Sequence, residues 1–130
     1  MTIQYFIGTP KSSGAEVIRS YERQVDLKGD SYIHYNLSNI EDCGDFLPRY
    51  VDLLPRSDCG RNIQSSPHEG EELVYVLQGT MELWVAGIKY VLTEGDSAHY
   101  LSTVPHKWVN TTNQVVHLLT INDTNFYLQA

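Results

Sequence analysis

The chain has 130 residues, 42% of them hydrophobic and 19% charged, and a formal net charge of −7. This length fits one domain with a hydrophobic core of its own, and the composition excludes a disordered or collagen-like protein. Because an acidic chain lacks the basic surface that nucleic-acid phosphates require, we expect no direct binding to DNA or RNA.

The first segment, Met1–Gly14, has no basic start followed by a long apolar run, so it is a poor secretory signal. No stretch of the sequence approaches the length of a membrane span. We therefore expect a cytoplasmic protein with no membrane partner. Because thiols stay reduced in that compartment, Cys43 and Cys59 are interpreted as free loop cysteines, with a disulfide or a thiolate metal pair as the less favoured alternatives.

Residues 1–40 are predicted to form a short extension that packs on the domain formed by residues 41–130. Ser13 and Glu16 have the spacing of a helix capping box. Apolar residues then recur at helical spacing, at Val17, Tyr21 and Val25. These patterns predict a short helix within the extension.

The rest of the chain consists of short segments rich in apolar and β-branched residues, with turn residues between them. Such segments predict strands. The predicted strands are 32–37, 46–54, 73–78, 81–85, 88–92, 98–101, 107–109 and 114–121. Ala86–Gly87 predicts a hairpin, and Glu94–Asp96 predicts a turn in which Asp96 acts as the cap. Many short strands at close spacing indicate an all-β sandwich or barrel.

His68 and Glu72 are an even number of residues apart, as are Glu72, Val74 and Val76. Alternate residues of a strand face the same side, so a regular strand places all four on the inner face of the barrel. A carboxylate on an otherwise apolar face is costly unless a cation neutralises it. The pattern therefore predicts a positive partner for Glu72.

No Arg or Lys occurs in residues 66–88 to serve as a local partner. His106 arrives from a different predicted strand and can supply a second nitrogen donor. Two imidazoles and one carboxylate are a minimal set that holds one transition metal with open coordination positions. The alternative is a metal-free group, with Glu72 and the histidines joined only by hydrogen bonds.

The remaining histidines, tyrosines and asparagine have simpler interpretations. His34, His99 and His117 lack such companions and are interpreted as surface or partly buried side chains. Tyr75, Tyr90 and Tyr100 are candidate hydrogen-bond donors, and packing on a sheet face is the favoured interpretation of each. We interpret Asn110 as a structural hydrogen-bonding residue at a strand end, not as a metal ligand.

Two motifs carry a resemblance to a known family. The motifs are Gly60-x5-Ser66-x-His68-x3-Glu72-x6-Gly79 and Gly95-x5-Leu101-x-Thr103-x2-His106-x3-Asn110. They resemble the first and second motifs of the cupin superfamily, and with flanking strands the resemblance covers about residues 45–122. It implies a single RmlC-like cupin domain, a double-stranded β-helix or jelly-roll barrel.

The resemblance also implies a site inside the barrel. It assigns one divalent transition metal (Fe, Zn, Ni, Mn or Co) to His68, Glu72 and His106. Cupins typically have a histidine where this chain has Ser66, so the ligand set is reduced to three. The chain also has Leu101 and Thr103 where the second motif usually has proline and glycine. The expected lining of the pocket is Ser66, Val74, Val76 and Trp108, although filling the core is the favoured interpretation of Trp108.

Within the superfamily, residues 68–79 are similar to cupin domains at the C-terminus of helix-turn-helix regulators and to the cupin domain of 2-hydroxypropylphosphonate epoxidase. The first similarity predicts a metal-binding protein that captures a small molecule, with a homodimer as its expected assembly. The second predicts a mononuclear non-haem iron oxygenase or another metal-dependent enzyme acting on a small polar substrate. A metal-free structural cupin is the third alternative, and the sequence alone does not choose between them.

Overall fold

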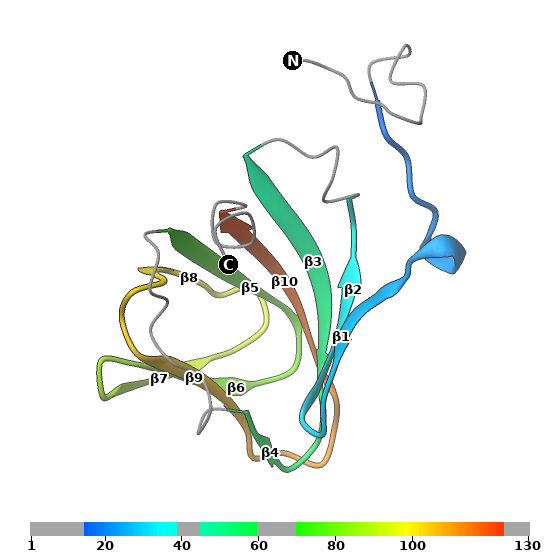
Figure 1. The fold of residues 1–130 in the computed structure, drawn as a ribbon. Helices are drawn as coiled ribbons and strands as arrows, with labels where there is room; N and C mark the ends of the chain where they lie inside the picture. Colours follow the sequence, from blue (N-terminus) through cyan, green and yellow to red (C-terminus); the bar gives the residue numbers. More distant parts are fainter. Residues whose placement is uncertain (1–14, 39–44, 60–69, 124–130) are drawn as a thin grey trace.

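The computed structural model describes residues 15–38, 45–59 and 70–123, which form two facing antiparallel sheets (Figure 1). The larger sheet has the strand order β1-β2-β3-β10-β5-β8, and the smaller has the order β4-β9-β6-β7. The strands are β1 (Val25–Lys28), β2 (Tyr32–Asn36), β3 (Phe46–Leu53), β4 (Ser57–Asp58), β5 (Glu71–Gln78), β6 (Met81–Val85), β7 (Ile88–Leu92), β8 (Ser97–Leu101), β9 (His106–Asn110) and β10 (Val116–Asp123). The predicted all-β barrel is confirmed, and each predicted strand is present.

The hydrophobic core lies between the two sheets. Along β3 and β10 every second side chain is buried, as expected for strands with one face on a core. The core residues are Val51, Leu53, Val74, Val76, Met81, Leu83, Leu92, Tyr100, Trp108, Val116 and Leu118. Each fully buried aliphatic side chain of this type stabilises the fold by about 1.5–3 kcal/mol.

The predicted N-terminal helix is wrong in the part that the structure describes. Residues 15–19 have no regular structure, and a single 3-10 turn, η2 (Ser20–Glu22), follows. Val17 is 61% exposed and Tyr21 83% exposed, so these two apolar side chains do not form a buried helix face. A short helix gains most of its stability from such packing, and without it the helical pattern is insufficient. Ser13 of the predicted capping box lies outside the described residues.

The two strands β1 and β2 add to the edge of the larger sheet beside β3. Residues 25–28 and 32–36 are thus sheet strands, although they precede the predicted domain boundary at residue 40. That boundary stays a prediction. Among the described residues, no helix has the length and apolar content that a membrane crossing requires.

Two turns agree with the sequence. Ala86 and Gly87 have positive φ values of 53° and 82° and join β6 to β7, which fits a tight two-residue hairpin turn. Asp96 accepts hydrogen bonds from the Thr93 backbone N–H at 2.8 Å and the Thr93 hydroxyl at 3.1 Å, so it closes its turn as predicted.

Gly79 and Gly87 both have a positive φ but differ in how closely neighbouring atoms approach them. Gly79 has a φ of 102°, and a Cβ there would lie 3.1 Å from Val116 Cγ2 and 3.3 Å from Val116 Cα. A Cβ at Gly87 would meet nothing within 4 Å. We expect Gly79→Ala to lower the free energy of unfolding by about 2–4 kcal/mol and Gly87→Ala by about 1–2 kcal/mol. Urea denaturation checks this, and equal losses would contradict the packing difference.

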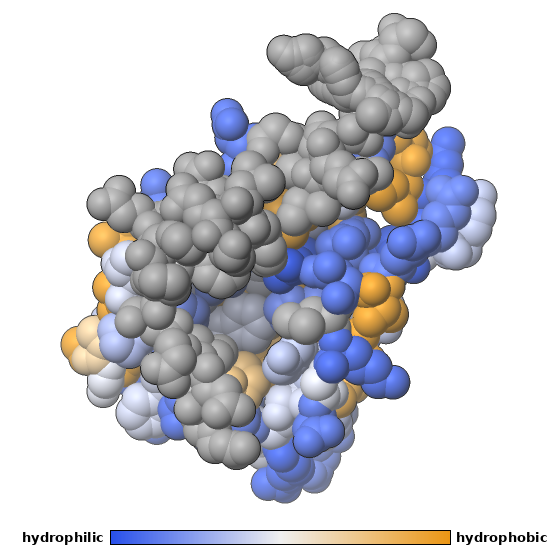
Figure 2. Space-filling view, in the orientation of Figure 1, coloured by the Kyte–Doolittle hydropathy of each residue, from blue (hydrophilic) through white to orange (hydrophobic). Residues whose placement is uncertain are grey.

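The outer surface carries both hydrophobic and hydrophilic residues. On the face shown in Figure 2, hydrophobic residues occur in separate groups between hydrophilic ones. Exposed apolar side chains on the edge strand β7 include Ile88, Tyr90 and Val91. Among the described residues, β7 is an edge of the smaller sheet, so these side chains lie along an open strand edge.

Candidate functional site

Glu72 lies on the inner face of β5. Its side chain is buried, as are those of Val74 and Val76, while the residues between them face outward to varying degrees. The alternation predicted from the sequence is therefore confirmed for these three residues. The Glu72 carboxylate therefore lies at the end of a row of buried apolar side chains, where it needs hydrogen-bond or ionic partners.

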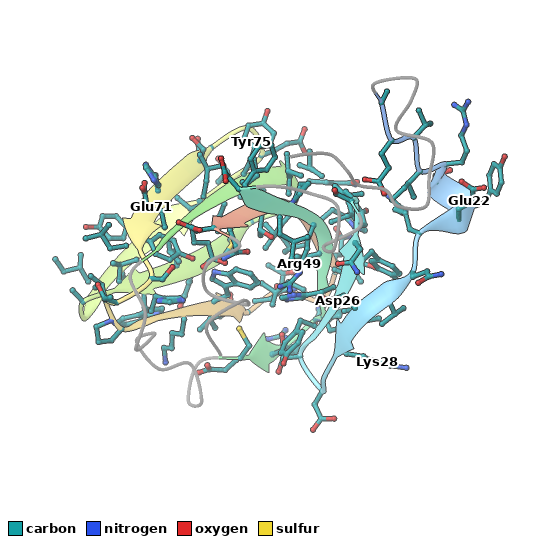
Figure 3. The ribbon with its side chains drawn as sticks, turned by 45° about the horizontal axis from the view of Figure 1, so that its top comes forward. Glu22, Asp26, Lys28, Arg49, Glu71 and Tyr75 are labelled. Carbon is teal, nitrogen blue, oxygen red and sulfur yellow. The ribbon has the colours of Figure 1, made fainter. Side chains whose placement is uncertain are left out.

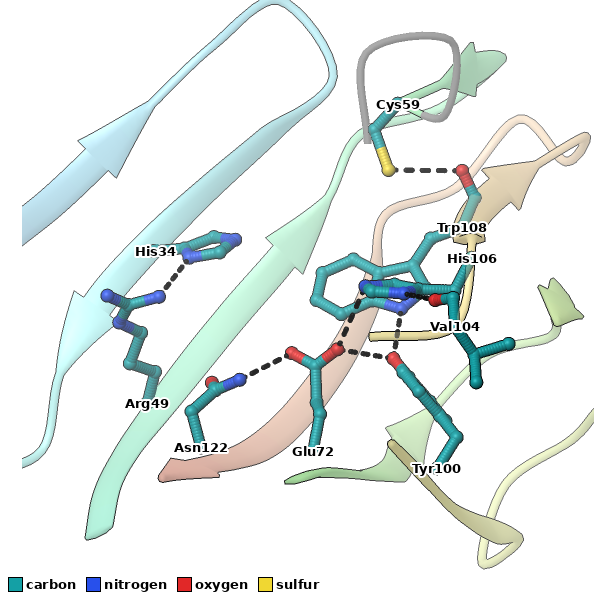
Figure 4. Close-up of polar contacts among 9 residues, drawn as sticks. All are labelled: His34, Arg49, Cys59, Glu72, Tyr100, Val104, His106, Trp108 and Asn122. Carbon is teal, nitrogen blue, oxygen red and sulfur yellow. Dashed lines mark hydrogen bonds and ion pairs between the residues drawn. The ribbon is translucent and has the colours of Figure 1, made fainter. Parts of the chain in front are cut away.

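The neighbouring strands supply those partners. Glu72 lies opposite Asn122 of β10 on one side and Tyr100 of β8 on the other. The Tyr100 hydroxyl donates to Glu72 Oε1 at 2.5 Å, and Asn122 Nδ2 donates to Glu72 Oε2 at 3.0 Å (Figure 4). Tyr100 in turn accepts a hydrogen bond from Trp108 Nε1 at 3.2 Å. The carboxylate is thus held in one orientation from both sides.

Tyr100 remains a neutral donor in this network. Burial, followed by the charge of Glu72 and the hydrogen bond to it, raises the pKa of Tyr100 well above its usual value. The hydroxyl proton therefore stays on Tyr100 at physiological pH. The interpretation of Tyr100 as a packing residue is only part of its role, because it also orients Glu72.

His106 approaches the same carboxylate from β9. Its Nε2 is 3.6 Å from Glu72 Oε1, and both side chains are about nine-tenths buried, with 12% and 11% exposure. His106 Nδ1 lies 2.7 Å from the backbone carbonyl of Val104. Because a carbonyl only accepts, Nδ1 carries a proton, and Nε2 is the ring nitrogen that faces Glu72. A metal-binding histidine is commonly held in this way, with one nitrogen bonded to a carbonyl and the other directed at the metal position.

Glu72 and His106 are two of the three predicted ligands. Ser66 and His68 lie outside the described residues, so their roles stay predictions. Within residues 15–38, 45–59 and 70–123, no three His, Cys, Asp or Glu side chains come together as a metal-binding group. A carboxylate oxygen beside an imidazole nitrogen nonetheless fits a divalent transition metal by donor type.

The other described residues of the predicted pocket are core residues. Val74 and Val76 are fully buried, and Trp108 is 4% exposed within the same cluster. Trp108 therefore fills the core, which was the favoured interpretation, and it also connects to Glu72 through Tyr100. Whether these residues line a ligand pocket stays a prediction.

The three other histidines have different environments. His99 is exposed and pairs with Glu71 at 2.6 Å, while His117 is half-buried and pairs with Asp52 at 2.8 Å. His34 is buried, with its ring 6.0 Å from that of Trp108 between centroids. His34 is therefore an interior residue on the same side as the candidate site, which its sequence context did not indicate.

Cys59 is a free thiol, as favoured from the sequence. Its Sγ donates to the Trp108 carbonyl at 3.1 Å. Burial raises the pKa of Cys59 to about 11, so the thiol stays protonated. A protonated thiol is neither a good nucleophile nor a metal ligand. Cys43 lies outside the described residues.

Sequence comparison identifies the family. A model of the cupin domain matches residues 57–122, a range that includes Glu72, Tyr100, His106 and Asn122. The chain belongs to the cupin family. No curated protein matches this cupin by sequence.

Solved structures show the same barrel. KdgF from Halomonas sp. matches with a TM-score of 0.69 and 16% identity, over 84% of this chain and 93% of that chain. The cupin domain of an XRE family transcriptional regulator from Enterobacter cloacae matches with a TM-score of 0.62 and 21% identity, over 72% and 96%. Hydroxypropylphosphonic acid epoxidase from S. wedmorenis matches with a TM-score of 0.69 and 22% identity, over 85% and 60%. At these identities the similarity establishes the fold.

Proposed function

We propose that this cupin binds one divalent transition metal through His68, Glu72 and His106 and uses it to hold a small-molecule ligand. The observation that carries the proposal is the His106 ring. Its Nδ1–H is tied to the Val104 carbonyl, and its Nε2 is directed at a buried carboxylate. Fe, Zn, Ni, Mn and Co all accept such ligands, so the proposal does not specify the metal.

The residues around Glu72 support the proposal. Metal-binding carboxylates are commonly oriented by hydrogen bonds from neighbouring side chains, and Tyr100 and Asn122 provide one to each oxygen of Glu72. Each oxygen keeps a further lone pair that can reach a cation. A bound metal with three protein ligands supplies a Lewis acid with open positions for a ligand.

Elemental analysis tests metal binding directly. Protein purified without chelator or affinity resin should hold close to one metal ion per chain, and Glu72→Gln and His68→Ala should lose it. His99→Ala is the matched control, because His99 also pairs with a glutamate but is exposed on the outer face. Metal-free protein would leave the metal-free structural cupin as the function class, and equal metal content in Glu72→Gln and the parent would place the metal at another site.

A ligand-binding protein is our first candidate and an enzyme our second. The similarity to the cupin domain of a transcriptional regulator supports a ligand-binding protein. In such a protein the ligand-bound barrel is recognised by a partner protein. Structures of the epoxidase hold Fe(II), which supports an oxygenase or another metal-dependent enzyme. Anaerobic loading with Fe(II), followed by oxygen-uptake measurements with small polar substrates, separates them, and substrate-dependent uptake would favour the enzyme.

We also propose a homodimer. The exposed apolar residues of edge strand β7 support it, because an unpaired strand edge can pair with a second copy. Size-exclusion chromatography with light scattering gives the molar mass, and a monomer at micromolar concentration would contradict the dimer.

A further inference from the structure

The inner face of the larger sheet is polar at one end. Strand pairing places Asn36 of β2, Arg49 of β3 and Thr120 of β10 in one row. Side chains paired in this way have Cβ atoms about 4.5–5.5 Å apart. Asn122 follows on the same face of β10 and pairs with Glu72. The polar row is therefore continuous with the candidate metal site, while the other end of the face carries core residues.

Three polar atoms in this region are buried without a hydrogen-bond partner among the described residues. They are Asn36 Oδ1, Thr120 Oγ1 and Asn122 Oδ1. The Thr120 side chain is nearly fully buried, with 1% exposure. Buried polar groups in folded proteins are normally hydrogen-bonded, so a cluster of unsatisfied ones indicates a missing partner.

The existing contacts define what that partner must offer. Asn122 Nδ2 already donates to Glu72, so Asn122 Oδ1 can only accept and requires a donor. The Thr120 hydroxyl both donates and accepts. A hydroxyl group on a ligand satisfies both residues, whereas an apolar group satisfies neither.

Charge adds a second requirement. Arg49 is buried on this face, and Figure 3 shows it near Asp26. Its guanidinium contacts Asp26 Oδ2 at 2.7 Å and His34 Nδ1 at 3.1 Å. Burial, followed by the charge of Arg49, lowers the pKa of His34 to about 4, so His34 is neutral. With a divalent metal present, the described charges of Glu72, Arg49 and Asp26 leave one net positive charge. A ligand with one negative charge neutralises it.

We propose that Thr120, Asn122, Asn36 and Arg49 form a recognition wall for a small hydroxylated carboxylate bound beside the metal. The ligand hydroxyls contact Thr120 and the two asparagines, and its carboxylate lies in the positive field of the metal and Arg49. This inference deepens the proposed function and rests on it for the metal charge.

Three matched three-carbon probes test the chemistry. Glycerate carries hydroxyls and a carboxylate, glycerol lacks the carboxylate, and propionate lacks the hydroxyls. NMR titration of zinc-loaded protein should show glycerate binding at least about tenfold more tightly than either of the others, since the proposal requires both groups to be recognised. Glycerate binding no more tightly than glycerol or propionate would overturn the proposal, while the zinc content reports the proposed function separately.

Thr120→Val tests the wall itself, because valine has nearly the same shape and lacks the hydroxyl. We expect glycerate affinity to fall roughly three- to tenfold, with propionate affinity unchanged. The urea midpoint of the ligand-free protein should rise, because an unsatisfied buried group is removed. Thr93→Val is the control, since the Thr93 hydroxyl is bonded to Asp96 in a surface turn and should affect neither probe.

The outcomes separate the two proposals. Unchanged glycerate affinity in Thr120→Val together with a lower urea midpoint would make the hydroxyl structural and overturn the wall. If the protein holds no metal, the proposed function fails and the titrations are repeated without zinc. Binding of glycerol or glycerate in preference to propionate that depends on Thr120 would then still support recognition of hydroxyls by the wall, and its absence would overturn the wall.

Discussion

Replacing Asn110 by alanine should lower the free energy of unfolding by about 3–5 kcal/mol, since it removes all the hydrogen bonds that this buried side chain makes with the ends of neighbouring strands. Asn110 is fully buried at the end of β9. Its Nδ2 donates to the carbonyls of Leu53, Leu54 and Gln114 at 2.8–3.1 Å. Its Oδ1 accepts from the backbone N–H and the hydroxyl of Thr112 at 2.9 and 2.7 Å. One side chain thus joins the ends of β3, β9 and the segment before β10.

The matched control is Asn113→Ala. Asn113 is exposed, and its Oδ1 accepts a single hydrogen bond from Arg56 Nε at 2.7 Å. We expect its loss to cost less than about 1 kcal/mol. Urea denaturation of both variants, with an unchanged dependence on denaturant, gives the comparison. A loss below about 1 kcal/mol for Asn110→Ala would contradict the assignment of Asn110 as the central structural hydrogen-bonding residue.

The strands could be predicted because their signals are local. Met81–Val85 and Ile88–Leu92 were predicted with the bounds that β6 and β7 have, since β-branched and aromatic residues flank a two-residue turn. The interpretation of Asn110 as a structural residue is likewise confirmed by its contacts at the end of β9. The strand signals depend on residues close together in the sequence, whereas the contacts of Asn110 with Leu53 and Leu54 depend on the fold.

The N-terminal helix failed for the complementary reason. Spacing at Val17, Tyr21 and Val25 is a local pattern, but a helix also needs a surface to cover. Val25 instead begins β1, which pairs with β2. Pairing with an existing sheet satisfies the backbone hydrogen bonds of this segment, and no local pattern shows that the sheet edge is available.

The candidate site was only partly predictable. The face of Glu72 followed from strand alternation, because that depends on β5 alone. Tyr100 and Asn122 become its neighbours only through the pairing of β5 with β8 and β10, which a single sequence does not specify. Alternation could have placed Tyr100 on the inner face, but the partner strand was needed to connect it to Glu72. The same holds for Arg49 and Thr120.

Metal should stabilise this cupin strongly, and Tyr100→Phe should weaken that effect. At zinc concentrations about a thousandfold above the dissociation constant, the proposed site adds about 4 kcal/mol to the free energy of unfolding. Loss of the Tyr100 hydroxyl removes the donor that orients Glu72 Oε1. We expect zinc affinity to fall about 10- to 100-fold, since changes to groups that orient metal ligands commonly have effects of this size.

The linked stabilisation is measured as the difference in unfolding free energy with and without zinc, separately for each variant. This difference removes the cost that Tyr100→Phe imposes on the metal-free protein, where Trp108 Nε1 loses its acceptor. Tyr90→Phe is the control, because Tyr90 is an exposed tyrosine on β7. Tyr100→Phe should show about 1.4–2.7 kcal/mol less zinc stabilisation than the control. Glu72→Gln should show no zinc stabilisation, because an amide replaces the charged ligand. An equal zinc-dependent increase in unfolding free energy in all variants would place zinc at another site.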